Sequence, residues 1–109
     1  MPMMNATHTN GRNIVLYVNY AGAAVKDTRR RYRKKVDKKA SFALLTTAKK
    51  EKTLSDVQRD AFDHIITCDF SSPASIAEAL RPYDDRLAAV TTRGERNVPY
   101  LERVIPYVP

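Results

Sequence analysis

The side chains that could take part in chemistry cluster just after apolar segments of the sequence. After the third apolar segment the sequence reads CDFSSP, in which Asp69 offers a carboxylate and Ser71 and Ser72 offer hydroxyls. Such groups can bind a ligand hydroxyl or contact a neighbouring domain, and they can equally satisfy the backbone amides of a loop. Similar polar stretches, NYAG, TT and TTRGE, follow the other apolar segments. The candidate contact residues are Asn19, Tyr20, Ala21, Gly22, Asp69, Ser71, Ser72, Thr91, Thr92, Arg93, Gly94 and Glu95.

The segment around Asp69 has several interpretations. Ser72 is typical of a helix N-cap and Pro73 of a first helical position, so we expect a helix to begin there. Asp69 and Ser71 then either satisfy loop amides or contact a ligand or another domain. A phosphorylated aspartate, as in bacterial receiver domains, is excluded. Those domains hold Mg²⁺ with carboxylates at the end of the first strand, where this sequence reads VNYAG and has no acid.

The sequence contains no complete set of catalytic or nucleotide-binding residues. Gly22 is the one glycine of VNYAGAA, whereas a dinucleotide fingerprint needs three at fixed spacing, so we interpret it as a turn residue. Walker and nucleophile-elbow motifs are also missing. Cys68 is the only cysteine and lies in an apolar run, which predicts a buried, inert thiol. His8 and His64 lack ligand spacing, so we expect no metal site. Because the catalytic motifs are missing, we expect no catalysis by this chain alone.

The apolar segments that precede these polar residues predict the fold. Four short segments, 13–20, 41–47, 64–70 and 86–92, are almost continuously apolar, which is typical of strands covered on both faces. Segments with helical spacing lie at 22–39, 53–62, 72–83 and 97–106. Alternating strands and helices favour parallel pairing. We therefore predict an α/β domain with a four-stranded, mainly parallel sheet and helices on both faces, a three-layer Rossmann-like fold.

Each predicted helix carries an apolar stripe that should face the sheet. Thr53 and Asp56 have the spacing of a capping box at the start of the second helix. The stripes are Val25, Tyr32 and Val36; Leu54, Val57 and Ala61; Ile76, Leu80 and Tyr83; and Val98, Leu101 and Ile105.

The positive charge of the chain is concentrated in one segment. Residues 26–52 hold 12 Lys or Arg and three acids, whereas the other residues hold seven Lys or Arg and nine acids. The cations of the first helix could form a solvated face, bind the phosphate backbone of nucleic acid or dock on an acidic partner domain. Tyr32 is the only interleaved aromatic and is needed for packing, so no base-stacking platform is expected. The patch comprises Arg29, Arg30, Arg31, Arg33, Lys34, Lys35, Lys38 and Lys39.

Length and composition are those of one soluble domain. The chain has 109 residues, of which 43% are hydrophobic and 28% charged. Residues 1–12 lack a secretory apolar core, which predicts a flexible tail and a cytoplasmic location. No apolar run approaches the roughly 20 residues that span a bilayer, so we expect no membrane partner.

The order of these segments resembles a known family. A second strand ending LLTT, a segment of acid, His, Ile, Ile and a later Asp (residues 63–69), and the stretch DDRLAAVTTRGERNVPYLERVIPYVP are similar to the N-terminal, Rossmann-like domain of ATP-grasp ligases. The resemblance covers residues 13–109 and implies that they are the N-terminal part of a longer protein. It implies an enzyme that activates a carboxylate with ATP to an acyl phosphate and joins it to an amine or a similar nucleophile. ATP and Mg²⁺ would bind to downstream domains, and no cofactor is expected in this chain.

In that family, the loops at residues 19–22, 69–72 and 91–95 would contact the small-molecule substrate or the downstream catalytic domain. The sequence departs from the common pattern in lacking a glycine-rich first turn and in having a basic first helix. Our leading hypothesis is a substrate-side ligase domain that is not catalytic alone. The alternatives are a small module that binds nucleic acid through helix 26–39 and a free-standing nucleotide-binding or regulatory domain.

Overall fold

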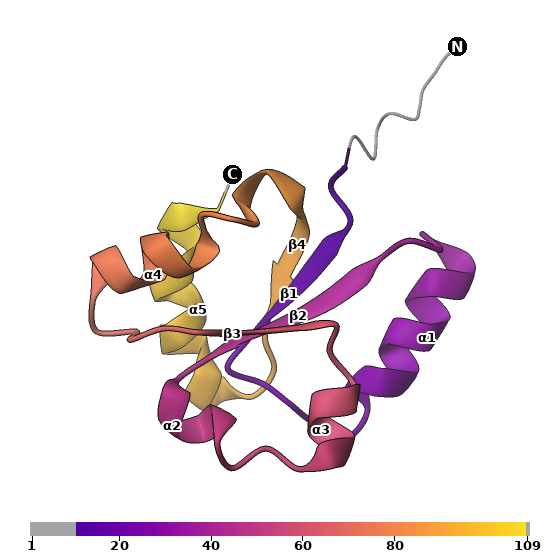
Figure 1. The fold of residues 1–109 in the computed structure, drawn as a ribbon, viewed down its shortest axis with the longest axis horizontal. Helices are drawn as coiled ribbons and strands as arrows, with labels where there is room; N and C mark the ends of the chain where they lie inside the picture. The colour runs from indigo at the N-terminus through magenta and orange to yellow at the C-terminus, as the bar shows by residue number, and fades with distance from the viewer. Residues whose placement is uncertain (1–10, 109) are drawn as a thin grey trace.

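A single sheet of parallel strands organises the chain in the computed structural model, which describes residues 11–108 (Figure 1). The strands are β1 (Ile14–Val18), β2 (Ser41–Thr46), β3 (His64–Thr67) and β4 (Leu87–Thr91), in the order β3-β2-β1-β4. The helices are α1 (Val25–Lys35), α2 (Ala48–Glu51), α3 (Asp56–Asp60), α4 (Pro73–Leu80) and α5 (Val98–Val104), with short 3₁₀ turns at Asp84–Arg86, Glu95–Asn97 and Ile105–Tyr107. The predicted α/β class and parallel sheet are confirmed.

The central strands are buried on both faces, as their continuous apolarity indicates. All five residues of β1 are buried, and Phe42 to Thr46 of β2 are buried as well. β1 pairs with β2 in uniform register, from Ile14 opposite Ser41 to Val18 opposite Leu45. β4 pairs with the other edge of β1, with an irregularity between Ile14 and Val15. β2 and β3 thus lie on one side of β1, and β4 lies on the other. Open α/β sheets bind ligands at such a change in strand order, here between β1 and β4.

Helices cover both faces and give the molecule three layers (Figure 1). On one face, α4 and α5 bury Ile76, Leu80 and Val104 against residues such as Leu16 and Leu45 of the sheet. On the other face, α1 and the α3 region pack over the sheet around Phe42. The residues of this second core are Val15, Tyr17, Ala21, Val25, Phe42, Leu44, Leu54, Ala61 and Phe62. The Rossmann-like description therefore holds.

Two helix starts illustrate how local sequence fixes element boundaries. Ser72 caps α4 by accepting a hydrogen bond from Ser75 N, and Pro73 is the first helical residue, as predicted. The predicted capping box of Thr53 and Asp56 is wrong. Ser55 and Gln58 form the box of α3 instead. The Thr53 hydroxyl donates to the carbonyl of Lys50 and closes the turn after α2.

The predicted apolar stripes are only partly correct. Val36, Val57, Val98 and Ile105 are exposed, with exposed fractions between 43% and 67%. Val36 lies just after α1, and α3 and α5 have only 5 and 7 residues, so the helical period does not extend over the predicted stripes. In α5 the buried apolar residue is Val104, one position before the predicted Ile105.

Several boundaries differ from the prediction. β3 ends at Thr67, and the chain then turns toward α4, so the predicted strand 64–70 is shortened. The short helix α2 was not predicted, because Ala48 is the only apolar residue of AKKE and one residue sets no period. Residues 1–10 of the predicted flexible tail, with His8, lie outside the described residues, as does Pro109. Within the described part, no helix is long and apolar enough to cross a membrane.

Candidate functional site

The carboxyl ends of β1, β2 and β4 are joined by one polar network around Asn19. The Asn19 Oδ1 accepts a hydrogen bond from Thr46 Oγ1 at 2.9 Å, at the end of β2. Its Nδ2 donates to Asn97 Oδ1 at 3.1 Å, just before α5. The Asn19 N–H donates to the Leu45 carbonyl at 2.7 Å. One side chain thus ties three segments that are far apart in the sequence.

The backbone of Asn19 explains why this residue type stands there. Its φ is +55°, the left-handed region that Asn tolerates better than most non-glycine residues. Because the chain turns sharply at this point, the amide side chain is directed back across the ends of the strands. Thr46 is completely buried, so the hydrogen bond to Asn19 satisfies a hydroxyl that has no access to water.

Asn97 and Thr92 hold the other side of the network. Asn97 is 6% exposed, and its Nδ2 donates to the Arg93 carbonyl at 2.8 Å. Its N–H donates to the Gly94 carbonyl at 3.0 Å, a turn in which Gly94 has a φ of +85°. The Thr92 hydroxyl donates to the Val18 carbonyl at 2.5 Å, which joins the end of β4 to the end of β1.

Three cationic side chains surround this network. Lys50 Nζ donates to the Asn19 carbonyl at 2.7 Å, so α2 places an amine directly over the end of β1. Burial lowers the pKa of Lys50, and the nearby positive charge of Arg96 lowers it further. Burial raises the pKa of Tyr17, and the positive charge of Arg93 partly opposes this shift. We name Asn19, Thr46, Lys50, Thr92, Arg93, Arg96 and Asn97 the exit rim.

The exit rim contains some of the predicted contact residues. Asn19, Thr92 and Arg93 belong to it, the Gly94 carbonyl accepts from the Asn97 N–H beside it, and Thr91 ends β4. Glu95 is exposed at the start of the next turn.

Tyr20, Ala21 and Gly22 instead turn toward the core under α1. Tyr20 stacks on Tyr17, with ring centroids 6.2 Å apart, and the buried Ala21 accepts from Gln58 Nε2 at 3.0 Å. A Cβ at Gly22 would lie 2.0 Å from the Tyr20 hydroxyl, so a larger residue there would require the Tyr20 side chain to move.

The third predicted cluster is a separate group at the end of β3. Asp69 Oδ1 accepts from the backbone N–H of Ser71 at 2.9 Å and from its hydroxyl at 2.6 Å. These hydrogen bonds, that of the side chain first, lower the pKa of Asp69. This geometry is the loop-satisfying arrangement described above. A hollow of about 430 Å³ lies beside it, lined by Thr47, Ala48, Thr67, Cys68, Asp69 and Ser75.

Cys68 borders this hollow but is a poor nucleophile. Its side chain is buried, and burial raises the pKa of the thiol to about 11, with a smaller effect from the negative charge of Asp69. A thiol with such a pKa is almost fully protonated at neutral pH, and the thiolate is the reactive form. The structure thus supports the prediction of an inert thiol.

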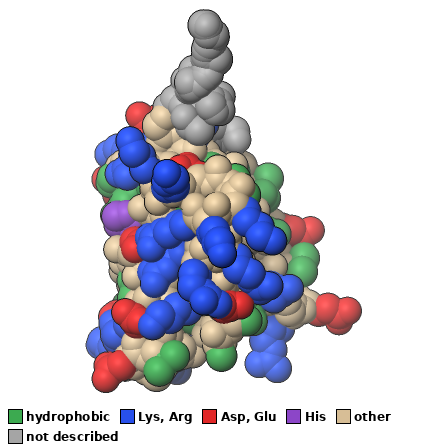
Figure 2. All heavy atoms as spheres, turned by 90° about the vertical axis from the view of Figure 1, so that its right-hand side faces the viewer, with side chains coloured by type: hydrophobic (Ala, Val, Ile, Leu, Met, Phe, Trp, Pro, Cys, Tyr) green, Lys and Arg blue, Asp and Glu red, His purple; other side chains and the backbone are tan. Residues whose placement is uncertain are grey.

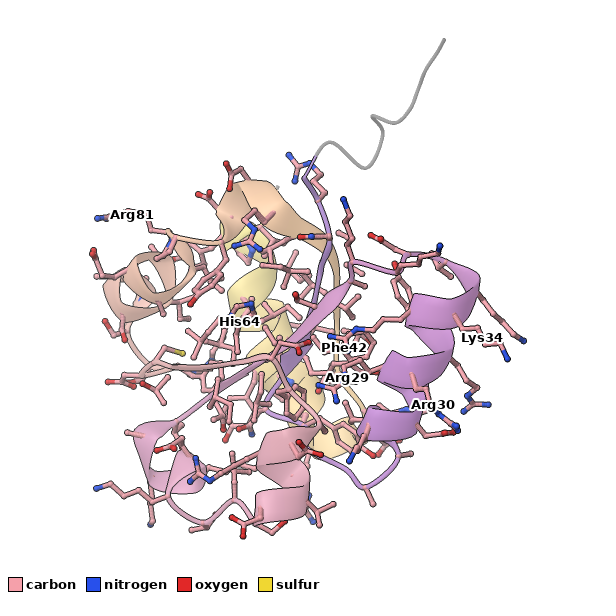
Figure 3. The ribbon with its side chains drawn as sticks, turned by 45° about the vertical axis from the view of Figure 1, so that its right-hand side comes forward. Arg29, Arg30, Lys34, Phe42, His64 and Arg81 are labelled. Atoms are coloured by element: carbon pink, nitrogen blue, oxygen red, sulfur yellow. The ribbon has the colours of Figure 1, made fainter. Side chains whose placement is uncertain are left out.

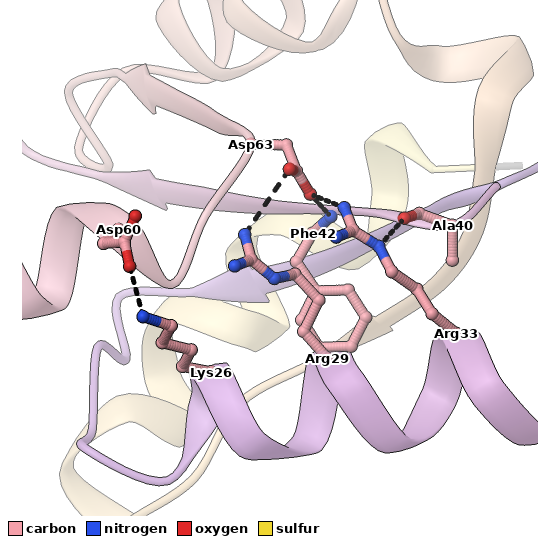
Figure 4. A network of polar contacts seen from close by, with 7 residues as sticks. All are labelled: Lys26, Arg29, Arg33, Ala40, Phe42, Asp60 and Asp63. Atoms are coloured by element: carbon pink, nitrogen blue, oxygen red, sulfur yellow. Dashed lines mark hydrogen bonds and ion pairs between the residues drawn. The ribbon is translucent and has the colours of Figure 1, made fainter. Parts of the chain in front are cut away.

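The basic helix α1 has an inner row of cations that the fold neutralises (Figure 4). Arg29 and Arg33 both pair with Asp63 at the start of β3, at 3.4 and 2.8 Å. The same carboxylate accepts from the Phe42 N–H at 2.8 Å, and Arg33 Nε donates to the Ala40 carbonyl at 2.8 Å. We name this group the Asp63 clamp. It fixes α1 to the sheet, so these two predicted patch residues have a structural role.

The outer row of α1 has fewer acidic partners. Arg30 and Lys34 extend from α1 away from the sheet, whereas Arg29 lies on the side facing Phe42 (Figure 3). Arg30 and Arg31 both pair with Asp27 on the same helix. Among residues 11–108, no acidic side chain pairs with Lys34, Lys35, Lys38 or Lys39. Blue cationic side chains dominate this side of the molecule in Figure 2. We name Arg30, Arg31, Lys34, Lys35, Lys38 and Lys39 the basic face.

Sequence reasoning missed four members of the exit rim: Thr46, Lys50, Arg96 and Asn97. Each lies on a different element from Asn19, and no fixed spacing links them. The sequence signal that could have identified Thr46 is the pair Thr46 and Thr47, two hydroxyl residues at the end of an apolar strand. Asn97, at the start of the last predicted helix, was not assigned a contact.

Within residues 11–108, no three His, Cys, Asp or Glu side chains are grouped closely enough to hold a metal ion. Comparisons with family models, curated proteins and solved structures gave no match. The class of protein is therefore defined by its fold, a three-layer parallel α/β domain with a polar, cationic rim at the strand exits.

Proposed function

We propose that this chain is the substrate-side domain of an ATP-dependent ligase of the ATP-grasp type and that its exit rim binds the carboxylate substrate. The observation that carries the proposal is the position of Lys50 over the end of β1, with Arg96 close enough to lower its pKa. The strand order changes direction between β1 and β4, and ligands of open parallel sheets bind at that point. Clustered cations there favour an anionic ligand.

The chemistry of the rim suits a carboxylate better than a nucleotide. Lys50 and Arg96 can pair with carboxylate oxygens, and the Asn19 network holds the ends of the strands in place. A nucleotide would require a glycine-rich turn after β1, but that turn reads NYAG and has one glycine. The Tyr20 side chain occupies the space next to Gly22. ATP is therefore assigned to domains outside this chain.

In the proposed reaction, a carboxylate oxygen attacks the γ-phosphorus of ATP, and ADP leaves with the bonding electrons. An amine then attacks the acyl phosphate carbon, and inorganic phosphate leaves. The exit rim contributes by binding and orienting the carboxylate, which lowers the entropic cost of the first attack. The residues of the exit rim include no carboxylate or imidazole that could act as a general base, so proton removal from the amine is assigned elsewhere.

The test is a steady-state assay of the polypeptide encoded by the whole reading frame. ADP formation is measured with a panel of carboxylates and amines. Lys50→Gln combined with Arg96→Gln should raise KM for the carboxylate about tenfold or more, the loss expected for hydrogen bonds to a charged group. KM for ATP should not change. Lys49→Gln is the matched control, since this exposed lysine of the same helix lies outside the rim.

Two results would overturn the proposal. An absence of carboxylate-dependent ADP formation across the panel removes the ligase class. A rise in KM for ATP, with KM for the carboxylate unchanged, moves nucleotide binding to this rim and favours a nucleotide-binding domain instead.

A further inference from the structure

We propose that the basic face of α1 binds the phosphate backbone of double-stranded nucleic acid. This surface is distinct from the exit rim: α1 lies along one side of the sheet, whereas the rim lies at the carboxyl ends of the strands (Figure 1). The inference is independent of the ligase proposal. It depends on the difference between the inner and outer rows of cations on the same helix.

The inner row has acidic partners supplied by the fold. Lys26 pairs with Asp60, and Arg29 and Arg33 pair with Asp63. These contacts join α1 to α3 and to the start of β3. A hollow of about 540 Å³ over this half of α1 is lined by Ala23, Lys26, Asp27, Arg29, Arg30 and Arg33. Because acids already neutralise several of its cations, only Arg30 of its lining residues is included in the basic face.

In the outer row, Arg30 and Arg31 pair only with Asp27 of the same helix, and the lysine side chains have no acidic partner among residues 11–108. Lys34 and Lys35 complement the negative end of the helix dipole, which is a small stabilising effect. Lys38 and Lys39 follow the helix and bring four lysines close together, with Asp37 as the one acid among residues 34–39. Mutual repulsion of like charges destabilises a folded domain. A cluster that the fold does not neutralise is suited to an external polyanion.

The composition of the surface identifies the class of polyanion. Val36 is the one large apolar side chain exposed on this segment, so the surface lacks the apolar face with which a helix enters a lipid interface. Tyr32 is occupied by packing against Phe42, with ring centroids 5.9 Å apart, so it cannot stack on an unpaired base. The remaining groups are lysine ammonium and arginine guanidinium cations, which can contact phosphates without reading the base sequence.

The spacing of the cations fits a duplex backbone. Arg30 and Lys34, and likewise Arg31 and Lys35, are four residues apart on α1, so their Cβ atoms are about 6 Å apart in two adjacent rows. Lys38 and Lys39 extend these rows beyond the helix. A duplex presents about one negative charge per 1.7 Å of its axis, so several cations can contact phosphates together.

The test is the salt dependence of binding to a short fluorescent duplex, in DNA and RNA forms, measured by anisotropy. With six phosphate contacts, the slope of log K against log salt should be about −5. Raising salt from about 50 to 200 mM should then weaken binding by about 10³-fold. Lys34→Gln, Lys35→Gln and Lys38→Gln together should halve the slope and reduce the salt effect to about 40-fold. Far-ultraviolet circular dichroism confirms that the variant is folded.

The control variant removes the same charge elsewhere. Lys49→Gln, Lys52→Gln and Arg81→Gln together lower the net charge by three and leave the basic face intact, so the slope should not change. A flat salt response, or an equal loss of slope in both variants, would overturn the proposal. Equal or tighter binding to poly-glutamate, or to vesicles of anionic lipid, with the same dependence on Lys34, Lys35 and Lys38 would also overturn it in favour of an acidic protein or a membrane.

Discussion

The exit rim and the basic face are both polar, but the fold treats their polar groups differently. At the rim, Asn19 is hydrogen-bonded to the buried side chains of Thr46 and Asn97, and Lys50 donates to the Asn19 carbonyl. On the basic face, Lys34 and Lys35 extend from the helix with no acidic partner among the described residues. Groups that the fold satisfies contribute to stability and position a site. Groups that it leaves without partners contribute little to stability and are available for binding.

The Asp63 clamp offers the largest effect with which to test this comparison, because it satisfies cations on the inner side of the basic helix. Asp63→Ala removes the partner of Arg29, whose side chain is only 14% exposed, and of the Phe42 N–H. The free energy of unfolding should fall by about 3 kcal/mol, the cost of losing hydrogen bonds to a charged group and leaving donors unpaired. Urea denaturation measures the change.

Asp27→Asn is the matched control for the clamp. This residue also pairs with two arginines of α1, but at the surface, where ion pairs contribute little. Its variant should unfold at the wild-type urea concentration. If both variants lose the same stability, the distinction between inner and outer cations is wrong.

Asn19 tests the rim in the same way. Asn19→Ala removes the acceptor of the buried Thr46 hydroxyl and places a side chain with a Cβ but no amide at a φ of +55°. We expect a loss of about 2 kcal/mol in the free energy of unfolding. Asn19→Gly relieves the backbone and still loses both side-chain hydrogen bonds, so it should recover only part of that loss. Full recovery in the glycine variant would show that the network contributes nothing to stability.

Cys68, which follows β3, should make the free energy of unfolding depend on pH. The folded pKa of about 11 lies above the ordinary thiol value of 9.0, so the folded state holds the proton more tightly than the unfolded state. The stabilisation is therefore complete below pH 9 and is lost as the pH rises toward 11. Relative to Cys68→Ala, wild type should lose about 1 kcal/mol between about pH 8 and pH 10, as urea unfolding at both pH values measures. A constant difference would contradict the burial of this thiol.

The basic face should show the smallest effect on stability. Lys34→Gln, Lys35→Gln and Lys38→Gln together should change the free energy of unfolding by less than about 0.5 kcal/mol, since repulsion is relieved while a small dipole contribution is lost. Thermal unfolding measures this change. A large destabilisation would show that the fold itself needs these lysines.

The sequence was sufficient for the sheet because its signal is local and strong. Continuous apolar segments predicted all four strands, and strand–helix alternation predicted parallel pairing. Ser72 and Pro73 predicted the start of α4 for the same reason, since a cap depends on adjacent residues. The apolar stripes failed at Val57, Val98 and Ile105, where short helices end before the helical period can decide which residues are buried.

The exit rim could be predicted only in part, because its members meet through tertiary structure. Asn19, Thr92 and Arg93 follow strands and were therefore candidates. Lys50 lies on a short helix that has no apolar period, so the sequence did not indicate its position. Asn97 is the first residue of a predicted helix, and its sequence position alone indicated no contact. Only the strand order places these two residues beside the end of β1.

The most direct test of the central claim, that the exit rim binds an anionic substrate, is an amide chemical-shift titration of the ¹⁵N-labelled chain with succinate as a dicarboxylate probe. The account predicts saturable shifts at Asn19, Lys50 and residues 93–97, retained in Lys49→Gln and lost in Lys50→Gln. Shifts that follow α1 and leave the rim unmoved, or rim shifts that persist in Lys50→Gln, would contradict it.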